Sequence, residues 1–139
     1  MEIRLARYYG YCFGVQRALD MVHTALKDGP FPVRTLGPII HNPTAVTELK
    51  EMGAMPVYSP GEVTIGTLVQ RSHGTTKEEA ALIPPGVRVL DATCPFVERA
   101  QKKAEEYVSR GMVVVLVGDR DHPETRAILS HAGKEAVCV

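Results

Sequence analysis

The amino-acid sequence predicts an α/β protein whose parallel sheet carries helices on both faces, in three layers. Two observations support this class. Short apolar runs alternate with amphipathic segments along the chain, and turn residues such as Gly and Pro separate them. The alternation is clear where the apolar run 87–90 passes through Asp91-Ala92-Thr93-Cys94-Pro95 into the charged segment 96–110. Such units join parallel strands by right-handed crossovers.

The apolar runs and the periodic segments give the expected elements in order. The expected strands are 3–8, 33–36, 56–58, 67–70, 87–90, 112–117 and 135–139. The expected helices are 15–28, 43–53, 77–83, 96–110 and 123–130.

Helix-start and helix-stop residues fix most of these boundaries. Asn42 is a favoured N-cap, and Pro43 suits the first helical position. Gly111 is a natural stop for the helix that begins near Pro95. The following run, 112–117, is the most apolar in the sequence, which predicts a strand buried on both faces.

Five soft or titratable residues recur at the same kind of place, just after a strand and just before a helix. In parallel sheets these junctions meet at the carboxyl edge, where ligands bind. Such a residue alone is more often a core thiol or a solvated loop histidine, but five at matching junctions predict a site. They are Cys12, His41, His73, Cys94 and His122.

The composition limits the classes of binding partner and the cellular compartment that are expected. The chain has 139 residues and 45% hydrophobic content, and its 16 basic residues balance 16 acidic ones. This balance gives no indication of nucleic acid or membrane binding, and no apolar run approaches the length of a membrane span. Three cysteines without disulfide-like spacing indicate a cytoplasmic protein that uses thiols for metal binding or chemistry.

The residues alone leave the chemistry open. Two thiolates with two imidazoles, from Cys12, His41, His73 and Cys94, would suit a structural zinc ion, whereas thiolates with spare histidines would suit an iron–sulfur cluster beside an anion. Histidines at helix N-termini also suit phosphate. Thr44, Thr75 and Thr76 could add hydroxyl donors, and Glu124 could move a proton unless it only stabilises its helix dipole.

Five motifs together resemble the 4-hydroxy-3-methylbut-2-enyl diphosphate reductase family of the non-mevalonate isoprenoid pathway, along the whole chain and in the same order. They are Gly10-Tyr11-Cys12-Phe13-Gly14-Val15 with Arg17-Ala18, His41-Asn42, Ser72-His73-Gly74, Asp91-Ala92-Thr93-Cys94-Pro95 and His122-Pro123-Glu124.

The resemblance implies an enzyme with a 4Fe-4S cluster, electrons from ferredoxin or flavodoxin, and reductive loss of the hydroxyl of an allylic diphosphate. It implies that Cys12 and Cys94 are cluster ligands and that Glu124 supplies a proton. It further implies that His41, His73 and His122 bind the substrate.

Family members are about twice as long and contain three similar α/β domains, so the resemblance implies an N-terminal portion. A first domain is expected at 1–94 and the start of a second at 95–139. The third cysteine ligand is then absent, because Cys138 lies in the last expected strand and is expected to be a core residue. The alternatives are a non-catalytic module with a Cys/His zinc site and a self-assembling interaction domain.

Overall fold

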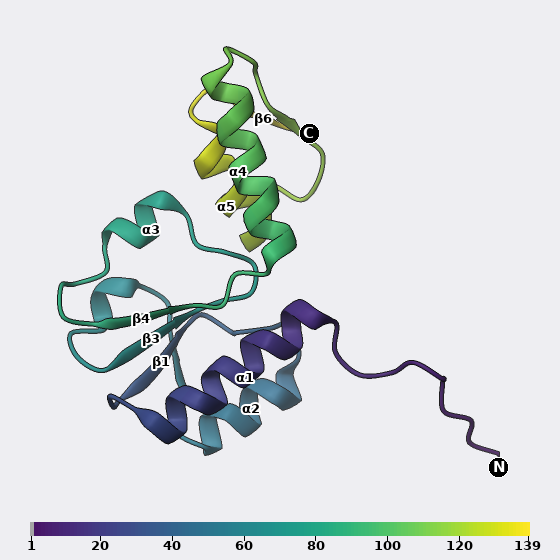
Figure 1. Ribbon diagram of the computed structural model, residues 1–139, viewed down its shortest axis with the longest axis vertical. Helices are drawn as coiled ribbons and strands as arrows, with labels where there is room; N and C mark the ends of the chain where they lie inside the picture. Colours follow the sequence, from purple (N-terminus) through teal and green to yellow (C-terminus); the bar gives the residue numbers. More distant parts are fainter. Residues whose placement is uncertain (1) are drawn as a thin grey trace.

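The structure, a computed structural model, describes residues 2–139 and confirms the α/β class. Its main sheet has four parallel strands in the order β2-β1-β3-β4 (Figure 1). The strands are β1 (Val33–Leu36), β2 (Met55–Val57), β3 (Thr67–Gln70) and β4 (Arg88–Asp91). Each lies within one or two residues of the run predicted from the sequence.

Both faces of this sheet are covered. Helices α1 (Phe13–Asp28) and α2 (Pro43–Glu51) lie on one face, and the short helix α3 (Lys77–Ala81) lies on the other (Figure 1). Neighbouring residues of a strand point to opposite faces, so Val69 joins the core under α1 while Leu68 joins a second core with Leu36 and Val57. This arrangement confirms the predicted three layers. A 3₁₀ turn, η1 (Pro60–Glu62), follows β2.

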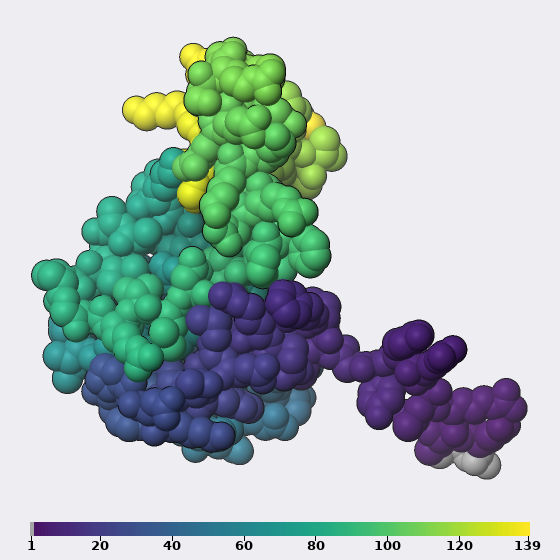
Figure 2. Space-filling model, viewed as in Figure 1, coloured from purple at the N-terminus to yellow at the C-terminus, as the bar shows by residue number. Residues whose placement is uncertain are grey.

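Residues 95–139 form a smaller lobe at one end of the molecule (Figure 2). Helices α4 (Pro95–Ser109) and α5 (Pro123–Ala132) pack against each other. Beside them is a two-stranded parallel sheet of β5 (Val115–Leu116) and β6 (Val137–Cys138).

The predicted strand 3–8 is wrong. Residues 2–11 form no helix or strand and extend away from α1, with Ile3, Leu5 and Tyr8 each more than 75% exposed (Figure 1). A strand needs a neighbour for its backbone hydrogen bonds. None of the described strands runs beside this segment, so the segment does not form a strand despite its apolar pattern.

The prediction that 112–117 is buried on both faces is also wrong. Only Val115 and Leu116 are strand, and Val113, Val115 and Val117 are 56%, 60% and 82% exposed. Their two-stranded sheet is too small to cover them. Cys138, expected in the core, is half-buried for the same reason, and its thiol donates to the carbonyl of Gly118 at 3.4 Å.

Among residues 2–139 no helix combines the length and the apolar character needed to cross a bilayer.

Candidate functional site

Four of the five predicted junction residues adjoin or form the N-cap of a helix. Cys12 caps α1, Cys94 caps α4 and His122 caps α5, while His41 directly precedes Asn42, the cap of α2. His73 lies in the loop between β3 and α3. The predicted N-cap of α2 is therefore confirmed. His41, His73 and Cys94 follow strands of the main sheet and His122 follows β5, but Cys12 follows no described strand, so its predicted strand–helix junction is wrong.

The three histidines of these junctions form one cluster, called here the histidine cluster. The ring centroid of His41 lies 4.3 Å from that of His73 and 5.3 Å from that of His122. The centroids of His73 and His122 are 5.5 Å apart, with the rings nearly perpendicular. Residues separated by 32 to 81 positions in the sequence thus converge at one edge.

His73 is the most perturbed member of the cluster. Desolvation by burial is the main cause that lowers the pKa of His73 from 6.5 to about 4, and the nearby His41, His122 and Arg71 lower it further. Its Nδ1 is buried and has no hydrogen-bond partner. His73 is therefore neutral at pH 7, in a place where several groups that carry or can gain positive charge converge.

The loop that carries His73 is held by its neighbours. The Ser72 backbone N–H and hydroxyl both donate to the carbonyl of Ile39, at 3.4 and 3.2 Å, and the Cys94 backbone N–H donates to the carbonyl of Ser72 at 2.9 Å. The guanidinium of Arg71 donates to Gly74 at 3.3 Å and pairs with Glu79 at 3.2 Å. Ser72 thereby links the loops of His41, His73 and Cys94.

The two cysteines at helix N-termini are free thiols. Cys12 is exposed and Cys94 half-buried, and neither side chain caps its own helix by a hydrogen bond. The first turn of α1 lies against Cys94, since a Cβ on Gly14 would be 2.6 Å from its Sγ. Arg17 of α1 also donates to the carbonyls of Thr93 and Asp91, at 3.1 and 3.2 Å.

Glu124 lies in the first turn of α5, beside the histidine cluster. Its backbone N–H donates to Nδ1 of His122 at 3.3 Å, and the residue is half-buried. Within the described part of the chain its carboxylate has no hydrogen-bond partner and no ion pair. The carboxylate therefore takes no part in the described hydrogen bonds and ion pairs that hold the fold.

The hydroxyl donors suggested by the sequence have different environments. The Thr76 hydroxyl accepts from the Glu79 N–H at 3.1 Å in a capping box, so it is already engaged. The Thr75 hydroxyl is buried without a partner, and Thr44 is exposed. Ser72 and Arg17 belong to motifs identified in the sequence, but their roles in holding the site loops were not predicted. Their hydrogen bonds join residues far apart in the sequence, so local patterns do not reveal them.

The four-ligand zinc site suggested as an alternative is not formed. Within residues 2–139, His41, His73 and His122 are the only group of three or more potential metal ligands whose ligand atoms lie within 4.8 Å of one another. The group includes neither cysteine. A structural zinc site of Cys12, His41, His73 and Cys94 would require a different arrangement of these side chains.

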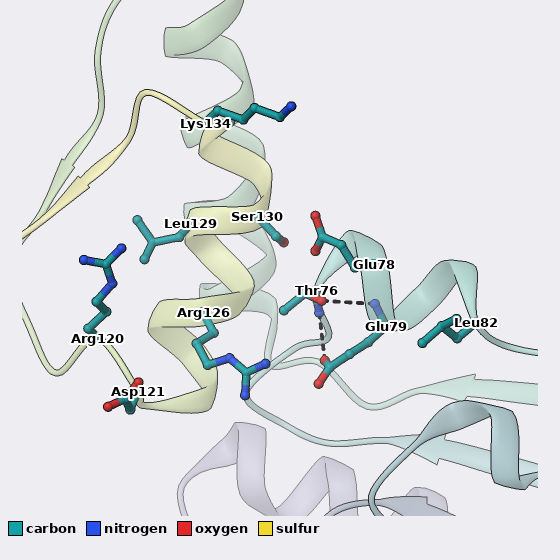
Figure 3. Close-up of a pocket in the computed structure, with 11 residues that line it drawn as sticks. Thr76, Glu78, Glu79, Leu82, Arg120, Asp121, Arg126, Leu129, Ser130 and Lys134 are labelled. Atoms are coloured by element: carbon teal, nitrogen blue, oxygen red, sulfur yellow. Dashed lines mark hydrogen bonds between the residues drawn. The ribbon is translucent and has the colours of Figure 1, made fainter.

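Two hollows lie near the cluster. One of about 370 Å³ borders His41 and is lined mainly by apolar residues of the α2 entry, including Ile40 and Val46. Another of about 570 Å³ lies between α3 and α5, where Arg126 and Glu79 line it (Figure 3). The second hollow is lined by Thr76 but by none of the clustered histidines, neither of the N-terminal helix cysteines, and not by Glu124.

Similar proteins share both the sequence and the fold. A protein named 4-hydroxy-3-methylbut-2-enyl diphosphate reductase from Geobacter metallireducens is 48% identical, over all of this chain and 49% of its own length. One of the same name from Anaeromyxobacter sp. (strain Fw109-5) is 42% identical, over 95% of this chain and 47% of its own. The chain thus spans about half the length of the curated relatives it matches.

Solved structures agree with these relatives. A structure of (E)-4-hydroxy-3-methyl-but-2-enyl diphosphate reductase, described as the terminal enzyme of the non-mevalonate pathway, matches 99% of this chain and 50% of its own, with a TM-score of 0.84 and 39% identity. A Plasmodium falciparum reductase structure matches 96% of this chain and 42% of its own, with a TM-score of 0.89, but at 24% identity it supports the fold alone.

The family model described as LytB protein matches residues 3–139, which is almost the whole chain. This coverage agrees with the relatives and with the resemblance carried by the five motifs. The chain therefore belongs to the LytB protein family.

Proposed function

We propose that this chain is part of a 4-hydroxy-3-methylbut-2-enyl diphosphate reductase and supplies much of its diphosphate site, two cluster ligands and a proton donor. The reaction breaks the carbon–oxygen bond of an allylic alcohol, consumes two electrons and two protons, and releases water with isopentenyl or dimethylallyl diphosphate. The observation that carries the proposal is the convergence of three histidines, with the Glu124 backbone bonded to His122 and the Cys94 backbone bonded to Ser72 beside His73.

The histidine cluster suits the diphosphate. His41, His73 and His122 come from three different junctions, and their rings lie within 5.5 Å of one another. The pKa of His73, about 4, reflects burial first and then repulsion among neighbouring positive charges. An anion bound among the rings would relieve that repulsion and favour protonated, donating imidazoles. The N-terminus of α2, capped by Asn42, adds backbone N–H groups beside His41.

Cys12 and Cys94 fit two ligand positions of an iron–sulfur cluster. Both thiols are free and lie at helix N-termini. Gly14 leaves space against the Cys94 sulfur that any side chain would fill. A 4Fe-4S cluster bound there would deliver electrons and polarise the substrate hydroxyl. We propose that a third cysteine lies outside this chain.

Glu124 is the proposed proton donor. Its carboxylate has no partner among the described residues, and its backbone is tied to His122, a member of the proposed diphosphate site. A carboxyl group acts as a general acid when it lies within hydrogen-bond reach of the group that it protonates. Glu124 could therefore give up its proton next to the bound substrate.

The remaining assignments follow from the same proposal. We place domain one at 1–94 and the start of domain two at 95–139, because β4 ends at Asp91 and α4 begins at Pro95. Ferredoxin or flavodoxin would supply electrons, and the cytoplasm is the proposed compartment because reduced thiols persist there.

A hybrid enzyme tests the proposal. This chain would replace the matching half of the Geobacter metallireducens reductase, to which it is 48% identical. Purified and reconstituted without oxygen, the hybrid is expected to reduce the allylic diphosphate. Glu124→Gln should lower its rate by at least about a hundredfold, typical of lost general acid catalysis. Cys94→Ser should lower its iron and sulfide content, and Cys138→Ser should change neither.

Two results would contradict the proposal. One is a folded hybrid that carries iron and sulfide but does not reduce the substrate, and the other is a fully active Glu124→Gln variant. Pyrophosphate binding to the 139-residue chain, measured by calorimetry with His41→Gln and His23→Gln compared, tests the diphosphate site even where the hybrid fails to fold.

A further inference from the structure

We propose that the histidine cluster is also a binding site for a divalent transition-metal ion of the zinc type, held by one ring nitrogen from each of His41, His73 and His122. These nitrogens lie within 4.8 Å of one another. Three protein ligands leave a fourth coordination position open to water, as in zinc sites that are not purely structural.

The rings need only a small movement to reach metal geometry. Zinc–nitrogen bonds of about 2.0–2.1 Å place tetrahedral ligand nitrogens roughly 3.3 Å apart, so each ring would move inward by on the order of 1 Å. His41 is exposed and can rotate without displacing core residues. The rings of His73 and His122 are half-buried. Their planes are nearly perpendicular, and their centroids are 5.5 Å apart.

The lone pairs of the cluster are largely unengaged. Nδ1 of His73 is buried and has no partner among the described residues, which is unfavourable for a polar atom. Coordination through Nδ1 would give that nitrogen its missing partner. His122 accepts one hydrogen bond, from the Glu124 N–H at 3.3 Å, and among residues 2–139 this is the only hydrogen bond of the cluster that metal binding would break.

The donor set selects the class of metal. The group contains three imidazoles and neither a carboxylate nor a thiolate. Imidazole suits Zn²⁺, Co²⁺, Ni²⁺ and Cu²⁺, whereas Mg²⁺ and Ca²⁺ prefer oxygen ligands. The nearby cation Arg71 opposes metal binding only weakly, because Glu79 pairs with it at 3.2 Å in a half-buried ion pair.

The metal site uses the same side chains as the proposed diphosphate site but does not depend on the proposed reaction. An imidazole lone pair that binds a metal cannot at the same time carry a proton toward a phosphate oxygen. A metal ion and a diphosphate therefore require different protonation of the same imidazoles. The binding of each can be measured in the absence of the other.

Cobalt titration tests the site. Co²⁺ alone is added to the 139-residue chain in phosphate-free buffer, because phosphate and pyrophosphate bind divalent metals in solution. We expect one Co²⁺ per chain, with visible absorption typical of nitrogen ligands and no thiolate charge-transfer band. The Cys12→Ser/Cys94→Ser variant should bind Co²⁺ equally well, which separates this site from the proposed cluster ligands.

Variants of the cluster give the decisive comparison. His41→Gln and His122→Asn should each weaken Co²⁺ binding by at least about tenfold, the lower end of losses for impaired metal ligation. Asn is a favoured N-cap, so His122→Asn preserves the start of α5 while removing the imidazole. His23→Gln is the matched control, since His23 is exposed on α1 and outside the cluster.

The proposal is overturned by either of two results on folded protein, as judged by circular dichroism. One is unchanged Co²⁺ affinity in both cluster variants. The other is Co²⁺ binding, or a thiolate charge-transfer band, that is lost only in the Cys12→Ser/Cys94→Ser variant. Pyrophosphate binding in metal-free buffer reports separately on the diphosphate site, so failure of one assignment is distinguishable from failure of the other.

Discussion

Gly14 in the first turn of α1 lies directly against the thiol of Cys94 at the start of α4. A Cβ on Gly14 would be 3.0 Å from Cβ of Cys94 and 2.6 Å from its Sγ, and the second distance is one that real Cβ atoms essentially never show. Glycine is therefore required here by close approach of two helices and not by backbone conformation. The contact positions one proposed cluster ligand against the helix that begins with the other, Cys12.

Gly14→Ala should consequently destabilise the chain although it replaces glycine inside a helix. Ala alone would stabilise a helix by up to about 1 kcal/mol. Overpacking against Cys94 should outweigh this and lower the free energy of unfolding by about 1–3 kcal/mol. Urea unfolding of Gly14→Ala, Cys94→Ala and the double variant measures the coupling. Equal effects of Gly14→Ala with and without Cys94 would show that the contact is not the cause.

Ser72→Ala should loosen the histidine cluster. The buried Ser72 hydroxyl donates to Ile39, two residues before His41, and links that loop to His73. Loss of this hydrogen bond should lower the free energy of unfolding by about 1 kcal/mol. Pyrophosphate affinity, measured by calorimetry, should fall as well. Ser109→Ala, which removes an exposed hydroxyl bonded within α4, is the control and should leave both quantities unchanged.

The stability of the fold should decrease as the pH is lowered through a range set by His73. Its pKa in the folded chain is about 4 against 6.5 for an unperturbed histidine, mainly because burial disfavours the charge. The unfolded chain therefore binds more protons between these values, so stability is full above pH 6.5 and declines toward pH 4. His41, His122 and Arg71 are the charged neighbours that add to this effect.

His73→Gln should flatten that decline, because glutamine does not titrate. Melting temperatures of the variant and the original chain, measured from pH 7.5 to 4, should converge as the pH falls. His23→Gln, an exposed control, should keep the original profile. A profile of His73→Gln parallel to the original would show that His73 titrates normally.

Local signals in the sequence predicted most of the fold and the location of the site. Asn42-Pro43 and Cys94-Pro95 mark helix starts through rules that act over a few residues, and the structure confirms both. Topology explains part of the histidine cluster, since His41 and His73 follow β1 and β3, whose carboxyl ends meet at one edge of the main sheet, whereas His122 comes from the second lobe.

Features that depend on distant contacts could not be predicted in this way. The segment 3–8 has the apolar content of a strand, but no described neighbour pairs with it. The run 112–117 is apolar enough for a buried strand, yet its small sheet leaves it exposed. The contact of Gly14 with Cys94 spans 80 residues, and only the packing of α1 beside α4 reveals it.

Arg17 provides a further test of how α1 holds the Cys94 loop. Its guanidinium reaches two backbone carbonyls, of Thr93 at 3.1 Å and of Asp91 at 3.2 Å. A lysine ammonium is a compact charge without the planar fork, so Arg17→Lys should lose at least one of these hydrogen bonds. The free energy of unfolding should fall by about 1 kcal/mol. The loop carrying Cys94 should then open more often.

The rate of Cys94 alkylation measures that opening. In a Cys12→Ser/Cys138→Ser background, Cys94 is the only thiol, and Arg17→Lys should raise its rate of reaction with iodoacetamide severalfold. Arg34→Lys is the matched control, because Arg34 makes only a local 3.5 Å hydrogen bond to Val33. If Arg34→Lys raised the rate as much, the effect would be general loosening. An unchanged rate in Arg17→Lys would mean that the hydrogen bonds of Arg17 do not hold the Cys94 loop closed.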